Sequence, residues 1–151
     1  MLRQAFTGRL KEAMKARNAR TISAVRMIIA GLKDRDIAAR GQGNAGGISE
    51  AEIHRMLQAM IKQRRESIAL YEQGNRADLA QQEREEITVI ESFLPRQFQT
   101  SEIEAAAMAA ITETEAASVK DVGKVMAVLR ERHAGAIDLG QAGAIVRRLL
   151  G

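Results

Sequence analysis

The sequence predicts an all-α protein, in which an N-terminal unit of four helices is followed by a small C-terminal unit of three helices. Apolar residues recur at intervals of three or four positions, which is the period of an amphipathic helix. The chain contains a single proline, and no segment alternates between apolar and polar residues as a strand does. With three Phe, one Tyr and no Trp, the core must be built from Ala, Leu, Ile and Met, which suits helix-on-helix packing.

The first 40 residues are predicted to form two amphipathic helices. The first covers residues 2–17, and the second runs from about Thr21, near its N-cap, to Ala38. Residues 41–47, GQGNAGG, are predicted to be a flexible loop. No strand precedes this loop and no Gly-Lys-Ser/Thr follows it, so it lacks the features of a phosphate-binding loop.

A third and a fourth helix are predicted to form an antiparallel hairpin. Ser49 at the N-cap and Glu52 at position N3 form a capping box that opens the third helix. Gly74 ends it, and Asp78 marks the start of the fourth helix. The fourth helix ends before Pro95, because a proline disfavours helical geometry in the residue that precedes it.

Pro95 is also the predicted boundary between an N-terminal unit, residues 1–95, and a C-terminal unit, residues 96–151. Three short helices are predicted in the C-terminal unit from their capping residues, which are Ser101 with Glu104, Ser118 with Asp121, and Asp138.

Arg64 occupies an unusual position in the third helix. At about 100° per residue it falls in the middle of the apolar stripe, whereas the adjacent Arg65 falls on the flank of that stripe. On the fourth helix, Glu83 and Glu86 likewise fall on the apolar face, level with Arg64 in an antiparallel hairpin. A buried charge requires a partner, so we predict a structural ion pair between Arg64 and Glu83 or Glu86.

The charge of the chain is unevenly distributed. Its net charge is +4, but residues 1–40 contain ten Lys/Arg and only three Asp/Glu. Residues 96–151 contain seven of each. The basic excess therefore belongs to the first two helices, where it is either a surface for an anionic partner or a solvated face.

Several classes of function are excluded or disfavoured by composition. The absence of Cys excludes disulfides, thiolate metal sites and a Cys nucleophile. No apolar run is long enough to span a membrane and no secretory signal is recognisable, so we predict a cytoplasmic protein that does not associate with membranes. The acidic run Glu83, Glu85, Glu86 is interpreted as ion-pairing, and we predict no catalytic residue, metal site or cofactor.

Four stretches of the sequence strongly resemble the YqeY-like family. They are KQRRESIALYEQGNRADLAQQEREEITVIESFLP (62–95), VKDVGKVMAVL (119–129), LKEAMKARN (10–18) and SAVRMIIAGLKDRDI (23–37). Residues 62–95 are the most specific, because they combine an Arg-Arg-Glu-Ser core, a glycine turn, an acidic helix and a Leu-Pro end. The family is related to the tail of the B subunit of the tRNA-dependent amidotransferase, a helical appendage that helps to hold tRNA.

The resemblance implies a non-catalytic, tRNA-associated module. An adaptor that docks on a translation-related protein is the first alternative, and a carbon–nitrogen ligase component, by family inheritance alone, is the second. With few aromatics available for base stacking, RNA would be recognised through its backbone and shape. The candidate phosphate contacts are Lys120, Lys124, Arg147 and Arg148, or alternatively the basic first hairpin with Lys11, Lys15, Arg17 and Arg20.

Gly123 and Lys124 near a predicted helix start allow two interpretations. One is a phosphate cradle at the helix N-terminus. The other is a glycine that lets a neighbouring helix approach closely, next to a solvated lysine.

Overall fold

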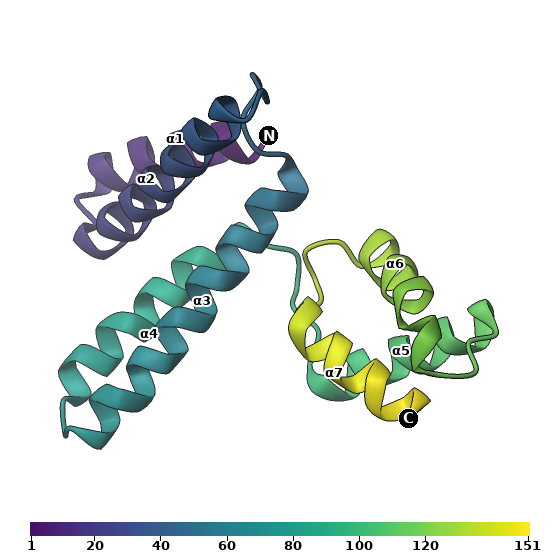
Figure 1. Cartoon of the computed structure of the whole chain (residues 1–151). Helices are drawn as coiled ribbons and strands as arrows, with labels where there is room; N and C mark the ends of the chain where they lie inside the picture. Colours follow the sequence, from purple (N-terminus) through teal and green to yellow (C-terminus); the bar gives the residue numbers. More distant parts are fainter. The chain divides into compact units, whose positions relative to one another are not determined.

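The computed structural model describes residues 1–151, and the prediction of an all-α fold is confirmed (Figure 1). None of the helices is long and apolar enough to cross a membrane. There are seven α-helices and one short 3₁₀ helix, which are α1 (Leu2–Ala16), α2 (Ala19–Gly41), α3 (Glu50–Gln73), α4 (Ala77–Glu91), α5 (Thr100–Thr114), η1 (Val119–Asp121), α6 (Val122–Arg132) and α7 (Leu139–Leu150).

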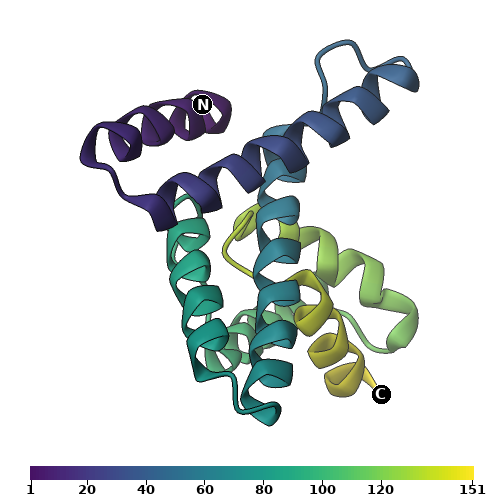
Figure 2. The same cartoon turned by 90° about the vertical axis from the view of Figure 1, so that its left-hand side faces the viewer.

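The contacts between helices divide the chain into two compact units, Met1–Leu94 and Pro95–Gly151. In the N-terminal unit, α1 lies along α2 and α3 lies along α4 (Figure 1). Helix α2 also crosses the last turns of α4 and the first turns of α3, as Figure 2 shows. Both helix pairs therefore share one core, which forms where α2 meets the hairpin.

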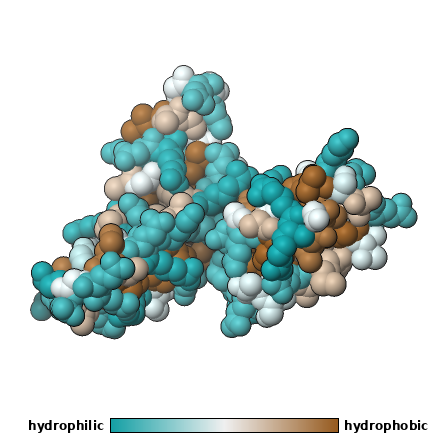
Figure 3. Space-filling view, turned by 60° about the horizontal axis from the view of Figure 1, so that its bottom comes forward, coloured by the Kyte–Doolittle hydropathy of each residue, from teal (hydrophilic) through white to brown (hydrophobic).

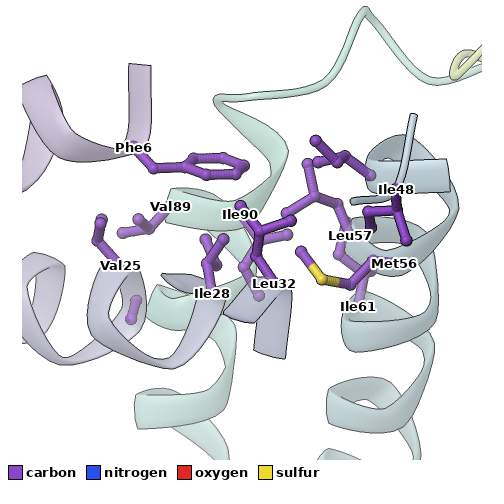
Figure 4. Packing of buried hydrophobic residues seen from close by; sticks show 12 residues of the cluster. Phe6, Val25, Ile28, Leu32, Ile48, Met56, Leu57, Ile61, Val89 and Ile90 are labelled. Atoms are coloured by element: carbon purple, nitrogen blue, oxygen red, sulfur yellow. The ribbon is translucent and has the colours of Figure 1, made fainter. Parts of the chain in front are cut away.

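Large apolar side chains fill the core of the N-terminal unit (Figure 4). Phe6 from α1, Ile28 from α2, Leu57 from α3 and Ile90 from α4 are completely buried. The ring of Phe6 packs edge-on against Phe93, with 4.8 Å between the ring centroids. Every helix of the unit contributes a side chain to this core. Loss of any one helix would therefore expose the core side chains of the other three to solvent.

The turn between α3 and α4 follows from local sequence. Gly74 is the C-cap of α3, and Asn75 takes a left-handed backbone conformation with φ 57°. Asparagine tolerates this conformation better than most residues. The chain reverses within a few residues, so that the shorter helix α4 packs along α3.

The core of the C-terminal unit is made of smaller side chains. Helix α5 contributes Ile103 together with two alanines, Ala107 and Ala110, and α7 contributes Ala142 and Val146. All five are at most 1% exposed. Alanine at these positions allows the three helices to pack closely, because it projects only a methyl group.

Two of the predicted helix starts are wrong by about two residues. Helix α2 is capped by Asn18, whose side chain accepts a hydrogen bond from the Thr21 amide, so Thr21 lies inside the first turn. Helix α5 is opened by a capping box of Gln99 and Glu102 instead of Ser101 and Glu104. In both cases nearby polar residues compete for the cap, and the packing of the helix selects one. The caps at Ser49, Ser118 and Asp138 are confirmed.

The glycine-rich segment between α2 and α3 is held in place by a buried carboxylate, although the sequence predicted a flexible loop. Asp36 accepts hydrogen bonds from the Ile48 amide at 2.9 Å and from Arg3 Nη2 at 2.7 Å. Arg3 Nη2 also donates to the Ile48 carbonyl at 3.0 Å. Gly47 lies against Asp36 with φ 79°, and a Cβ atom there would collide with the Asp36 carboxylate. The end of the loop is thereby fixed to α1 and α2.

Candidate nucleic-acid interface

The structure brings three of the four C-terminal candidate residues to one end of their unit. Lys120 lies in η1, and Arg147 and Arg148 lie in the last turn of α7. These elements touch, since a Cβ atom on Gly151 would be 3.7 Å from the Val119 side chain. Lys124 follows one turn later on α6.

Ion pairs neutralise half of this C-terminal set. Lys124 Nζ lies 3.7 Å from Asp121 Oδ1, and Arg148 Nη2 lies 3.2 Å from Glu104 Oε1 on α5. Arg147 folds back along its own helix toward Gly143. Lys120 and Arg147 are the two members of the set that have no carboxylate within 4 Å. The C-terminal unit as a whole has no net charge, because its seven Lys/Arg are matched by seven Asp/Glu.

The surface of the C-terminal unit is also partly apolar. Figure 3 shows apolar side chains gathered on one face of this unit. The large hydrophobic residues that it exposes are Met108, Val119 and Leu149. An apolar patch beside two free cations is a poor match for a polyanion, because phosphates gain nothing from contact with it.

The close-approach interpretation of Gly123 is wrong. A Cβ atom at this position would meet nothing within 4 Å, so no neighbouring helix requires a glycine there. The side chain of Asp121, which precedes the helix, accepts hydrogen bonds from the Ala117 and Ser118 amides. These hydrogen bonds keep the pKa of Asp121 below its ordinary value. The helix start therefore carries a carboxylate, which would repel a phosphate.

Lys11 and Lys15 lie on the outward face of α1. At 100° per residue they are at about 140° and 180° from the buried Phe6. Both are exposed, and neither has a carboxylate within 4 Å. Arg17, which caps α1 in a left-handed conformation, is also without an acidic partner. Arg20, by contrast, lies 3.0 Å from Glu85 of α4.

Helix α2 carries a further stripe of cations that the sequence analysis missed. Arg26, Lys33 and Arg40 are spaced seven residues apart, so they line up on one side of the helix at intervals of about 10 Å. All three are exposed and none has a carboxylate within 4 Å, although Arg40 donates a hydrogen bond to the Ala45 carbonyl. The seven-residue spacing was visible in the sequence and would have revealed this stripe.

Arg64 is buried between α3 and α4 and faces two carboxylates. Its Nε atom lies 3.0 Å from Glu86 Oε2 and 3.9 Å from Glu83 Oε2. The rest of the guanidinium group contacts the Met60 carbonyl at 3.3 Å and the Met27 sulfur at 3.4 Å. All of these contacts are with residues of this unit, so the arrangement joins α2, α3 and α4.

One cation facing two carboxylates leaves an excess of negative charge in this cluster. Burial raises the pKa of Glu83, and the neighbouring Glu86 carboxylate raises it further, while Arg64 lowers it only in part. Glu85, the third member of the acidic run, points to Arg20 instead. The described residues include no group of three or more His, Asp or Glu side chains placed to hold a metal ion.

The fold and these surfaces define a small, two-unit helical protein whose unpaired cations are concentrated on its first two helices. A family model described as Yqey-like protein matches residues 3–150. The chain therefore belongs to the YqeY-like family, and the resemblance seen in the sequence is confirmed.

Curated relatives carry the name "Altered inheritance of mitochondria protein 41, mitochondrial". The relative from Lachancea thermotolerans is 32% identical over 85 residues, which cover 56% of this chain and 43% of the relative. The relative from Saccharomyces cerevisiae is 28% identical over 97 residues, which cover 64% of this chain and 50% of the relative. The chain thus matches about half the length of these proteins.

The names of these relatives contradict the prediction of a cytoplasmic protein, because they are the names of mitochondrial proteins. That prediction rested on hydropathy and on the lack of a secretory signal. Neither property separates the cytoplasm from mitochondria, since organelle targeting is read from short sequences by receptors and leaves no mark on the helical core.

Proposed function

We propose that the protein is a non-catalytic helical module that binds tRNA, or RNA of similar shape, through the sugar–phosphate backbone. The main support is the charge distribution of the N-terminal unit. Of the ten Lys/Arg in residues 1–40, only Arg3 and Arg20 have a carboxylate within 4 Å. The remaining eight have no carboxylate partner, and each of them that contacts a phosphate would release bound counterions. The relation of the family to a tRNA-holding tail supports RNA as that polyanion.

The proposed contact surface is the basic hairpin of α1 and α2, in place of the C-terminal helices. It consists of the α1 pair Lys11 and Lys15 and the α2 stripe Arg26, Lys33 and Arg40. The C-terminal unit is less suitable because it is neutral and because Lys124 and Arg148 are already paired.

The aromatic residues support recognition of backbone and shape over recognition of bases. The chain has three Phe and one Tyr, and none of these four side chains is exposed. Single-stranded RNA is usually read by stacking its bases on exposed aromatic rings. A helical surface without such rings is suited to the phosphates of folded RNA.

Fluorescence anisotropy with labelled tRNA, measured over a salt series, tests this proposal. We expect Lys11→Ala/Lys15→Ala and Arg26→Ala/Lys33→Ala each to weaken binding. Each should also reduce the slope of log K against log salt, by about one for every phosphate that the variant no longer neutralises. The matched variant Lys120→Ala/Arg147→Ala removes the two free cations of the C-terminal set and should change the slope less.

Two results would overturn the proposal. Absence of binding at about 50 mM salt, where phosphate contacts are strong, would exclude RNA as the partner. A larger effect of the C-terminal variant than of either N-terminal variant would place the interface on η1 and α7 instead.

Docking on a translation-related protein is a second candidate, favoured by one surface feature. A shallow, mainly apolar groove of about 530 Å³ runs along the outer side of α2, lined by Ala19, Ile22, Ser23, Arg26, Met27 and Ala30. Exposed apolar grooves on a helix are typical of protein contacts. A photo-crosslinking residue in place of Ile22, compared with one in place of the exposed Gln81 on α4, separates the two candidates. A specific protein adduct at position 22 supports docking, whereas an RNA adduct there supports the basic hairpin.

A further inference from the structure

A shallow surface cavity, largely open to solvent, lies where the end of α2, the loop 42–49 and the first turns of α3 meet. Its volume is about 490 Å³, which falls within the range of pockets that hold small molecules. Part of its lining is apolar, with the buried Met56 of α3 and the buried Ile48, which precedes that helix, close to each other (Figure 4). Ala38 and Ala39 of α2 and Ala59 of α3 complete the apolar part.

Two guanidinium groups line the same cavity. Arg35 comes from α2 and Arg55 from α3, and both are exposed. Neither has a carboxylate within 4 Å, in contrast to Arg3, which is held by Asp36 on the same helix as Arg35. A guanidinium group presents five N–H donors in a planar fork that matches the oxygens of a carboxylate or a phosphate.

The acidic side chain in the lining does not cancel these two charges. Glu52 is the one carboxylate of the lining, and its Oε1 atom lies 3.2 Å from Ser49 Oγ at the start of α3. The lining therefore keeps a positive charge, and the donors of Arg35 and Arg55 remain free for a ligand.

The walls of the cavity are fixed without a ligand. Arg40 donates a hydrogen bond to the Ala45 carbonyl across the loop, and Asp36 binds the Ile48 amide at the end of the loop. Arg3 donates to the Ile48 carbonyl from α1. A site that is already ordered loses little conformational entropy when a ligand binds.

We propose that this cavity binds a small amphipathic anion, whose carboxylate or phosphate head lies between Arg35 and Arg55 and whose apolar body packs against Ala38, Ala39 and Ala59, next to the buried Ile48 and Met56. Two separated cations beside an apolar floor match a ligand with both parts, and neither inorganic phosphate nor an apolar molecule alone would use the whole site. The proposal is independent of RNA binding, because Arg35 and Arg55 belong to neither cation stripe of α1 and α2.

Four probes that share either a head or a body test this inference on the full chain. Hexyl phosphate and hexanoate carry the same apolar body on different anionic heads, hexanol lacks the charge, and inorganic phosphate lacks the body. Binding is followed by the NMR signals of the Ile48 and Met56 methyl groups. We expect saturable shifts with hexyl phosphate or hexanoate at an affinity about tenfold or more above those of hexanol and inorganic phosphate. The tighter of the two anionic probes identifies the preferred head.

Variants of the two arginines complete the experiment. Arg35→Gln and Arg55→Gln should each weaken binding of the anionic probes by about tenfold or more and leave hexanol unchanged, because each removes a charge-assisted hydrogen bond. Arg130→Gln, which changes an exposed and unpaired arginine of α6, is the matched control and should bind as the wild type does. Equal binding of hexanol and hexanoate, an unchanged affinity for the anionic probes in the combined Arg35→Gln/Arg55→Gln variant, or no saturable shift at about 10 mM probe would each overturn the proposal.

Discussion

The first two helices of the N-terminal unit leave most of their cations unpaired, and the unit buries the Asp36 carboxylate and the Arg64 cluster, whereas the C-terminal unit pairs more than half of its cations at the surface and buries no ion pair. In residues 1–40, eight of ten Lys/Arg have no carboxylate within 4 Å. In the C-terminal unit, four of seven are paired, and all of those guanidinium or ammonium groups are about half exposed or more. A surface pair stabilises little but cancels charge, so the pairing pattern indicates which unit can attract a polyanion.

The cores of the two units also differ, because the N-terminal core contains larger side chains than the C-terminal core. The N-terminal unit buries Phe6 together with several large aliphatic side chains, and Arg64 lies at the edge of that core. The C-terminal unit packs three short helices around a smaller core of three alanines and six branched aliphatic residues. Substitutions in the N-terminal core should therefore have large effects on stability, and surface substitutions in the C-terminal unit should have small ones.

The largest effect is expected from Phe6→Ala. This substitution removes a completely buried ring that packs against Phe93 and leaves a cavity between α1, α2 and α4. The free energy of unfolding, measured with urea, should fall by about 3 to 5 kcal/mol. Met108→Ala on the exposed face of α5 is the control, with a change of about 0.5 kcal/mol or less. Similar losses of unfolding free energy in both variants would contradict the assignment of Phe6 to the core and of Met108 to an exposed face.

Arg64→Met should lower the free energy of unfolding at pH 7 by about 3 kcal/mol, because Glu83 and Glu86 would then face each other without a cation. The matched variant Glu83→Gln should be as stable as the wild type or more stable at pH 7. The pKa of Glu83 is raised in the fold, so its contribution to stability is fully present below the ordinary value of 4.5 and is lost as the pH rises through the raised pKa.

The advantage of Glu83→Gln over the wild type should accordingly disappear as the pH falls below about 4.5. Urea unfolding at several pH values measures both variants. A stable Arg64→Met variant at pH 7 would show that this arginine is not required to neutralise the two carboxylates.

Replacing a glycine by alanine should lower stability at one position in the N-terminal unit and raise it at one position in the C-terminal unit. Gly47→Ala should destabilise the N-terminal unit by about 2 kcal/mol, because Gly47 has a positive φ and a Cβ atom would collide with Asp36. Gly123→Ala should stabilise the C-terminal unit by about 0.5 to 1 kcal/mol, because Gly123 is helical and its Cβ position is open. Thermal unfolding measures both, and a destabilised Gly123→Ala variant would contradict the open space seen beside α6.

The smallest effect on stability is expected from Arg148→Ala. Its partner Glu104 is 41% exposed, and such a pair contributes at most about 1 kcal/mol. The urea midpoint should therefore move little. A loss as large as that of Arg64→Met would show that exposed and buried ion pairs do not differ here.

Much of the local structure followed from short-range signals in the sequence. The capping residues Ser49, Ser118 and Asp138 were correct, because a side chain that caps a helix contacts an amide only two or three residues away. The position of Arg64 on the apolar stripe of α3 also followed from helical periodicity, and it is indeed buried.

Predictions that depended on a choice between neighbouring residues were less accurate. The start of α5 was assigned to Ser101 instead of Gln99, since both lie three residues before a glutamate.

The loop at Gly47 was predicted to be flexible because its composition is rich in glycine. Nothing local indicates that two distant side chains, Asp36 of α2 and Arg3 of α1, bind its end at Ile48.

The sequence by itself determined the helices, the uneven distribution of charge and the family, because helical period and capping act over a few residues and charge can simply be counted. Only the tertiary structure decided which cations are free. Arg148 meets Glu104 across 44 residues and Arg20 meets Glu85 across 65 residues, while Arg35 and Arg55 meet around one cavity. These partners are set by the way the helices pack, and no pattern within a single helix specifies them.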